Sequence, residues 1–175
     1  MGLAKPNRPE GRYARPARGK ANGGGPRVNG SAKGNGALRF EFQSNFDTGC
    51  EVQQRILDEV KRQGFNTNSL FATRLALEEA LVNAIKHGNK LDPKKKVIVE
   101  ARVSRDRVEI EVEDEGAGFV RTSVPDPTEE DNLCKCSGRG ILLIEAYMNS
   151  VNWLRGGRRV RMVRLNEPHE LPDRS

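Results

Sequence analysis

The stretch from Leu75 to His87 constrains the fold of this chain most strongly, because its residues are apolar around most of a helical circumference. A helix of that kind is normally buried. Three polar residues interrupt it at intervals of four, Glu79, Asn83 and His87, and at about 100° per residue they share one stripe. Burying such groups costs roughly a few kcal/mol each unless partners are present. The stripe therefore predicts one of two things. It is either a polar row hydrogen-bonded to neighbouring structure, or a cleft where an amide oxygen ligates a hard cation and a carboxylate orients or deprotonates a nucleophile.

The hydrophobic pattern around this helix predicts an α+β fold. Alternating residues indicate strands, and spacings of three and four indicate helices. Hairpins separate from helices along the chain, which indicates a two-layer sandwich with helices on one face of a mixed, mostly antiparallel sheet. The expected strands are 38–42, 96–103, 107–113, 151–154 and 160–165. The first expected helix is capped by Asp47 or Thr48 and runs to Gly64, and the other two cover 68–87 and 140–148. Residues 120–137 are expected to form a long loop.

Composition divides the chain into three parts. Residues 1–36 hold nine of the 18 glycines and four of the nine prolines, and their few apolar residues are isolated. Such a segment buries too little surface to offset its ordering entropy, so 1–36 is expected to be a disordered basic extension. Residues 37–166 form the expected domain, and 167–175 a polar tail.

Charge follows the same division. The chain as a whole carries a net charge of +6. Residues 1–36 contain eight basic groups and one acid, a net charge of +7, which leaves 22 basic and 23 acidic groups and a net charge of −1 for the rest. The extension is expected to be a solubilising tail, with contact to nucleic acid as the alternative; the domain itself shows no basic excess to attract nucleic acid.

Other classes of protein are excluded by simpler features. No run approaches the ~18–20 apolar residues of a membrane span, and the start lacks the apolar core of a secretory signal, so a cytoplasmic location is expected. The odd count of three cysteines argues against a disulfide framework. Cys134 and Cys136 are expected to be free thiols, because their spacing differs from the usual zinc pattern.

Two glycine motifs lie downstream of the polar helix. Asp114-Glu115-Gly116-Ala117-Gly118-Phe119 follows a predicted strand, where glycines permit a sharp turn or close approach to a flat ligand, and Asp114 could accept a hydrogen bond from an exocyclic amine. Ser137-Gly138-Arg139-Gly140 enters a predicted helix, where free N–H groups and the helix dipole suit a phosphate.

Taken together and in order, the three motifs resemble those of the GHKL (histidine kinase-like) ATPase superfamily, whose domain is known as the Bergerat fold. Glu79 to His87 is similar to its N-box, Asp114 to Phe119 to its G1 box, and Gly138-x-Gly140 to its G2 box. Within the superfamily the chain most resembles the anti-sigma factor serine/threonine kinases, over about residues 38–165.

The resemblance implies a role for each matching residue. Asn83 would hold Mg²⁺ that bridges the phosphates of ATP. Glu79 would be the catalytic base, taking the proton from a partner's serine or threonine hydroxyl. Asp114 would bind the adenine amino group, with Gly116 and Gly118 lining the base pocket.

A second set of residues would contact the phosphates. Ser137, Gly138 and Gly140 belong to this set by the resemblance, and Arg139 either adds charge there or faces solvent. His87 matches the N-box and counts as a nucleotide-binding residue without a defined role.

The implied function is that of an ATP/Mg²⁺-dependent protein kinase in a bacterial partner switch. Its expected partners are a sigma factor and an anti-anti-sigma protein of the STAS type, and a homodimer is possible. The alternative is a non-catalytic module that binds ATP and sequesters a protein partner.

One departure from the family pattern is Gly156-Gly157-Arg158-Arg159. A Gly-Thr whose hydroxyl helps to bind phosphate is usual at this place, and an arginine could substitute for it electrostatically.

Overall fold

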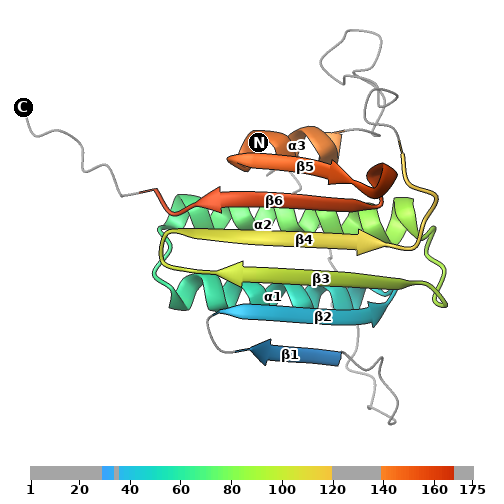
Figure 1. The fold of residues 1–175 in the computed structure, drawn as a ribbon, viewed down its shortest axis with the longest axis horizontal. Helices are drawn as coiled ribbons and strands as arrows, with labels where there is room; N and C mark the ends of the chain where they lie inside the picture. Colours follow the sequence, from blue (N-terminus) through green and yellow to red (C-terminus); the bar gives the residue numbers. More distant parts are fainter. Residues whose placement is uncertain (1–28, 34–35, 120–138, 168–175) are drawn as a thin grey trace, which may run out of the picture.

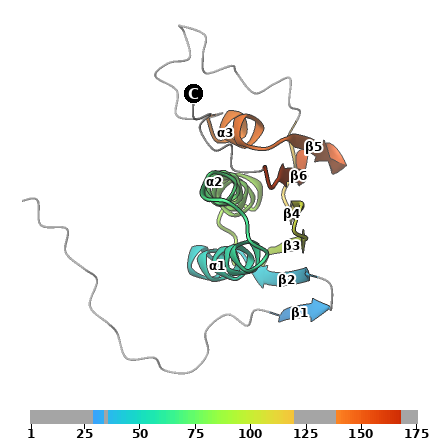
Figure 2. The same cartoon turned by 90° about the vertical axis from the view of Figure 1, so that its left-hand side faces the viewer.

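The computed structural model describes residues 29–33, 36–119 and 139–167, and its layers are those expected (Figures 1 and 2). Helices α1 (Phe46–Arg62), α2 (Thr67–Val82) and α3 (Arg139–Tyr147) cover one face of a sheet, and no helix of the described residues covers the other face, here called the open face (Figure 2). The two-layer α+β class is therefore confirmed. The strands are β1 (Asn29–Lys33), β2 (Ala37–Gln43), β3 (Lys96–Val103), β4 (Arg107–Asp114), β5 (Ser150–Leu154) and β6 (Arg159–Leu165). The described residues also form the π-helix η1 (Asn83–Gly88) and the 3₁₀ turn η4 (Arg155–Gly157).

The sheet has the order β1-β2-β3-β4-β6-β5. Every strand pairing among the described residues is antiparallel. Strands β3 and β4 form one predicted hairpin and β5 and β6 the other, and both hairpins lie within a residue or so of the expected bounds. Alternation with a period of two predicts such strands well because it directly reports which face is buried.

The core lies between the helices and the inner face of the sheet. Inward residues of β2, β3, β4 and β6 are almost fully buried against α1, α2 and α3. The largest core side chains with almost no exposed surface come from both layers: Ile56, Leu77, Ile85 and Ile144 from the helices, and Ile110 and Met162 from the sheet.

Two helix starts differ from the predicted positions. Helix α1 begins at Phe46 because the Oδ1 atom of Asn45 accepts a hydrogen bond from the backbone N–H of Thr48 at 3.0 Å; the prediction that Asp47 or Thr48 is the cap was wrong. Asn66 caps α2 in the same way, accepting from the Ser69 N–H at 2.8 Å.

The end of the second helix also differs. The α-helix gives way at Asn83 to six residues of π-helix, in which the Asn89 N–H donates to the Ala84 carbonyl oxygen at 2.8 Å. The spacing of polar residues could not predict this change, because a spacing of four suits both kinds of helix.

The segment expected to be disordered contributes a strand. Residues 29–33 pair with β2, with Asn29 opposite Glu41 and Lys33 opposite Ala37, so the disorder expected for 1–36 was wrong for these five residues. Gly36 makes the connection with a φ of 69°, which favours glycine. The compositional argument failed here because pairing with a sheet edge needs backbone groups and little apolar side-chain surface.

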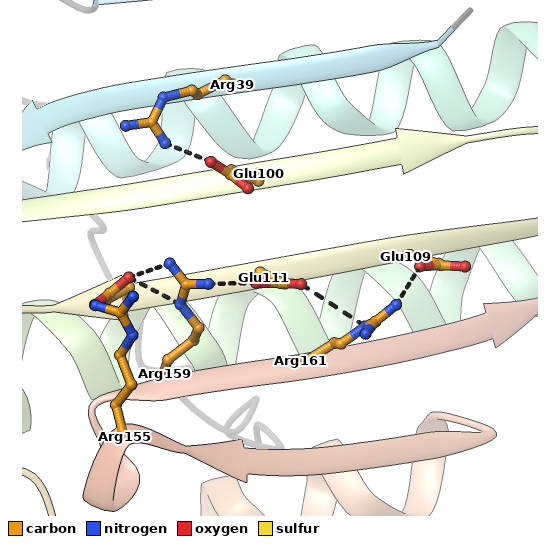
Figure 3. Close-up of polar contacts among 8 residues, drawn as sticks. Arg39, Glu100, Glu109, Glu111, Arg155, Arg159 and Arg161 are labelled. Atoms are coloured by element: carbon orange, nitrogen blue, oxygen red, sulfur yellow. Dashed lines mark hydrogen bonds and ion pairs between the residues drawn. The ribbon is translucent and has the colours of Figure 1, made fainter.

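The open face of the sheet carries a lattice of ion pairs (Figure 3). Arg159 contacts Glu111 and Glu113 of β4, and Arg161 donates to Glu109 at 2.8 Å. On strands β2 and β3, Arg39 Nη1 lies 2.5 Å from Glu100 Oε1. These charges largely neutralise one another, in keeping with the near-neutral charge of the domain.

Candidate functional site

A cavity of about 470 Å³ lies where α2 and η1 meet the ends of β4, β6 and α3. That volume is within the usual range for a small-molecule site. Six of the residues predicted for the site line it: Glu79, Asn83, His87, Asp114, Gly118 and Gly140. The cavity brings together three motifs that are separated by up to 61 positions in the sequence.

Glu79 and Asn83 lie beside the start of α3. A Cβ atom placed on Gly140 would be 2.5 Å from Glu79 Oε2 and 3.6 Å from Asn83 Nδ2. Only a residue without a side chain lets the helix end approach these two groups so closely. Both polar side chains are partly buried.

Asn83 has an unused hydrogen-bonding atom. Its Nδ2 atom is buried and has no partner in the described part of the chain. Buried polar atoms are nearly always paired, so an orphan beside a cavity indicates a site for another group. Rotation of the amide places its oxygen at the same position, where it can ligate a hard cation such as Mg²⁺. The residues present thus fit a bound cation.

Asp114 ends β4 and is held by its own turn. Its Oδ1 accepts a hydrogen bond from the Gly116 N–H at 2.7 Å. Burial raises the pKa of Asp114, and this hydrogen bond and the charge of Arg158 partly oppose the rise. Gly116 itself does not line the cavity; it serves the site through this hydrogen bond.

Close packing around Asp114 requires a second glycine. A Cβ atom on Gly88, at the end of η1, would overlap the Asp114 carboxylate, and one on Gly116 would overlap the Gly88 carbonyl oxygen. No sequence motif points to this packing, because the contact of Gly88 with Asp114 depends on tertiary structure.

Asn89 joins these pieces to the sheet. It is fully buried. Its side chain donates to Ser44 Oγ at 2.7 Å and to the Lys96 carbonyl oxygen at 2.9 Å, and it accepts from the Glu115 N–H at 2.8 Å. One side chain thereby ties the end of η1 to the ends of β2, β3 and β4.

His87 is exposed at the rim of the cavity. Partial desolvation of the ring, followed by the charges of Lys86 and Lys90, lowers its pKa, which favours the neutral imidazole. Lys86 and Lys90 also line the cavity, and the sequence motifs did not single them out. Their positive charges suit an anionic ligand.

The remaining wall is apolar. Phe119 and Trp153 pack edge to face with ring centroids 5.1 Å apart, and Trp153 is the single tryptophan of the chain. Ile141, Val112 and Val160 complete this wall. An apolar wall opposite polar groups suits a ligand with a flat ring and a charged end.

Four of the residues singled out in the sequence, Cys134, Cys136, Ser137 and Gly138, fall outside the part of the chain that the structure describes. Arg139 is the first residue of α3. Among the described residues Cys50 is a free, exposed thiol and no cluster of His, Cys, Asp and Glu suits a metal ion.

The fold and the cavity define a class of protein: a two-layer α+β domain with a ligand-sized cavity at one end of its sheet, polar on one wall and apolar on the other. Comparison with known families makes the class specific. The family described as "Histidine kinase-like ATPase domain" matches residues 47–164, and the chain belongs to this family. The GHKL resemblance expected from the three motifs is confirmed.

Individual relatives narrow the comparison. An anti-sigma F factor of Clostridium perfringens is 37% identical over 117 residues, which cover 65% of this chain and 83% of the relative. A serine-protein kinase RsbW of Listeria innocua is 31% identical over 96 residues, covering 51% of this chain and 61% of that protein. Its counterpart in Listeria monocytogenes is 28% identical over the same length.

No helix in the described residues is long and apolar enough to cross a membrane.

Proposed function

We propose that this chain binds ATP with Mg²⁺ in the cavity and acts as a serine/threonine protein kinase of the anti-sigma type. The observation that carries the proposal is the meeting of Glu79, the unpaired amide of Asn83 and the start of α3 at one point. The names of the relatives support the anti-sigma role. The substrate would be a serine or threonine of an anti-anti-sigma protein of the STAS type, and the other partner would be a sigma factor. With these partners the protein would act in the cytoplasm.

Each side chain has a task in this proposal. Asn83 would hold Mg²⁺, which neutralises phosphate charge during transfer. Glu79 would accept the proton of the partner's hydroxyl as that oxygen bonds to the terminal phosphorus of ATP, and the bond from that phosphorus to ADP would break so that ADP leaves. Asp114 would accept a hydrogen bond from the base, and the N–H groups at the start of α3 would bind phosphate oxygens. Lys86 and Lys90 would attract the triphosphate to the cavity.

The test is phosphate transfer from labelled ATP to a candidate anti-anti-sigma protein. Glu79→Gln should bind ATP normally and transfer phosphate about 10²- to 10⁴-fold more slowly, the usual contribution of a general base. Glu78→Gln is the matched control, because Glu78 is exposed on the same helix and does not line the cavity.

The outcomes separate the two candidate functions. Transfer by the native chain that survives Glu79→Gln would remove the base assignment. Binding of ATP and a sigma factor with no transfer at all would favour the non-catalytic sequestering module. Failure to bind ATP or ADP, with or without Mg²⁺, would overturn the site.

A further inference from the structure

The aromatic pair in the cavity wall, Phe119 and Trp153, comes from two separate parts of the fold. Phe119 follows the glycine motif at the end of β4, and Trp153 lies on β5. Both rings line the cavity, and their planes make an angle of 67°. Aromatic rings favour this edge-to-face contact. The wall has one defined shape only if each ring is fixed in its own place.

The turn between β5 and β6 fixes Phe119. The Phe119 N–H donates to the Gly156 carbonyl oxygen at 2.9 Å. A Cβ atom on Gly157 would lie 2.8 Å from Cδ1 of the Phe119 ring and would overlap the Phe119 carbonyl oxygen. The turn therefore packs closely against both the backbone and the ring of Phe119.

Trp153 has less support from the sheet. It lies on β5, the last strand in the sheet order, and pairs with Val160 of β6. Its ring is partly buried against the core, on the side where α3 lies next to β5 (Figures 1 and 2). A ring at a sheet edge has fewer neighbours than one on a central strand, so its orientation depends on the contact that α3 provides.

Helix α3 provides a hydrogen-bond acceptor. The Trp153 Nε1–H donates to Glu145 Oε1 at 3.2 Å. This N–H is the single polar group of the indole, so the bond defines the direction in which the ring points. Glu145 follows Ile144, which is fully buried in the core and fixes the rotation of α3. Glu145 is not among the described residues that line the cavity.

Given the proposed ATP site, we propose that Glu145 is a positioning residue for the nucleotide: it accepts the indole N–H and holds Trp153 in the orientation in which its ring and Phe119 form a wall for the base. The base then meets a preformed apolar surface, and no rotamer freedom of the indole is lost on binding. Glu145 acts through Trp153 and touches neither the base nor the phosphates.

The same hydrogen bond joins the two ends of the cavity. Helix α3 begins beside Glu79 and Asn83, where the phosphates are proposed to bind, and its Glu145 reaches the aromatic pair. Without the carboxylate the indole N–H needs another acceptor, and water at the sheet edge is the nearest source of one. The ring would then rotate among several orientations, and ATP binding would have to select one of them.

The test measures the affinity for ATP with Mg²⁺ by isothermal titration calorimetry on the full chain. Glu145→Met keeps the length of the side chain and removes the carboxylate. Glu145→Gln keeps an acceptor oxygen without the charge, and Trp153→Phe keeps an aromatic ring without the N–H. Glu78→Met is the control, because Glu78 is exposed on α2 and does not line the cavity.

We expect Glu145→Met to weaken ATP binding about three- to tenfold, the usual effect of having to immobilise one more side chain on binding. Glu145→Gln should stay within about twofold of the native affinity, because it restores the acceptor. The fluorescence anisotropy of the single tryptophan in the free protein should fall in Glu145→Met and stay native in Glu145→Gln. In a Trp153→Phe background Glu145→Met should have no further effect on ATP affinity, because the bond it removes is already absent.

Two results would overturn the inference and leave the proposed function standing. One is native ATP affinity in Glu145→Met, and the other is a loss as large in the Trp153→Phe background as in the native chain. An equal loss in Glu145→Gln or in Glu78→Met would also overturn it, since neither removes the acceptor of the indole. Absence of ATP binding to the native chain would overturn both the inference and the proposed function.

Discussion

Replacing Asn89 by alanine tests how the site is built into the fold. Asn89 has no exposed surface and makes three side-chain hydrogen bonds, to Ser44, Lys96 and Glu115. Two of the three partners are backbone groups, which lose their hydrogen-bonding partner when the amide is removed. The substitution should therefore destabilise the protein far more than removal of an ordinary surface asparagine.

The expected loss follows from these contacts. Each hydrogen bond contributes about 1 kcal/mol, which gives about 3 kcal/mol for the three. The small space left by the missing amide and the unpaired backbone groups add to this, for a total of about 3 to 5 kcal/mol. A domain in the middle of the usual range of about 5–15 kcal/mol of stability stays folded after such a loss, with its melting temperature lowered by about 10 °C or more.

Urea denaturation followed by circular dichroism measures this loss. Asn152→Ala is the matched control, since Asn152 is exposed on β5 and should change the free energy of unfolding by less than about 0.5 kcal/mol. A loss below about 1 kcal/mol for Asn89→Ala would refute the reasoning, because it would mean that the three hydrogen bonds are replaced by water at little expense.

Three other substitutions have defined outcomes. Asp114→Asn should raise the melting temperature at about pH 7 and lose this advantage at about pH 3. The folded state raises the pKa of Asp114, so the native protein has a stability in acid that it loses as the pH rises through that pKa, whereas the neutral asparagine loses nothing. The same variant should bind ATP more weakly. Gly118→Ala should cost about 1–3 kcal/mol in urea denaturation, since its φ is 77° and the new Cβ would overlap a carbonyl oxygen of the neighbouring turn; a native midpoint would contradict this. Arg159→Met removes contacts with Glu111 and Glu113 and should cost about 1 kcal/mol at low salt and less in high salt, so an equal loss in both would argue against an electrostatic origin.

Sequence reasoning predicted the layers and the central residues of the site because both depend on local periodicity. Alternation located the two hairpins, and the interval of four placed Glu79, Asn83 and His87 on one stripe. Their common cavity with Asp114 was reached only through family resemblance, since no local pattern measures the distance between a helix and a strand end.

The parts that were missed all depend on tertiary contacts. Strand β1 forms because β2 offers an edge, and the apolar wall of the cavity includes Trp153 from a hairpin at the far end of the sequence. Asn89 belongs to no sequence motif, yet its three partners come from three different strands or strand ends. The sequence singled out the run Gly156 to Arg159, but nothing local shows that Arg158 lines the cavity while Arg155 and Arg159 bind glutamates.

The π-helix has a consequence for how this chain could change by insertion or deletion. Its wide turns keep one more residue within the hydrogen-bonded ring than an α-helix would. Deleting a single residue, such as the exposed Lys86, would let α-helical turns of about 100° per residue replace the wider π turns, so Asn89 would keep roughly its present direction toward the strand ends. At this helix end, therefore, the π turns accommodate one residue without loss of the Asn89 anchor.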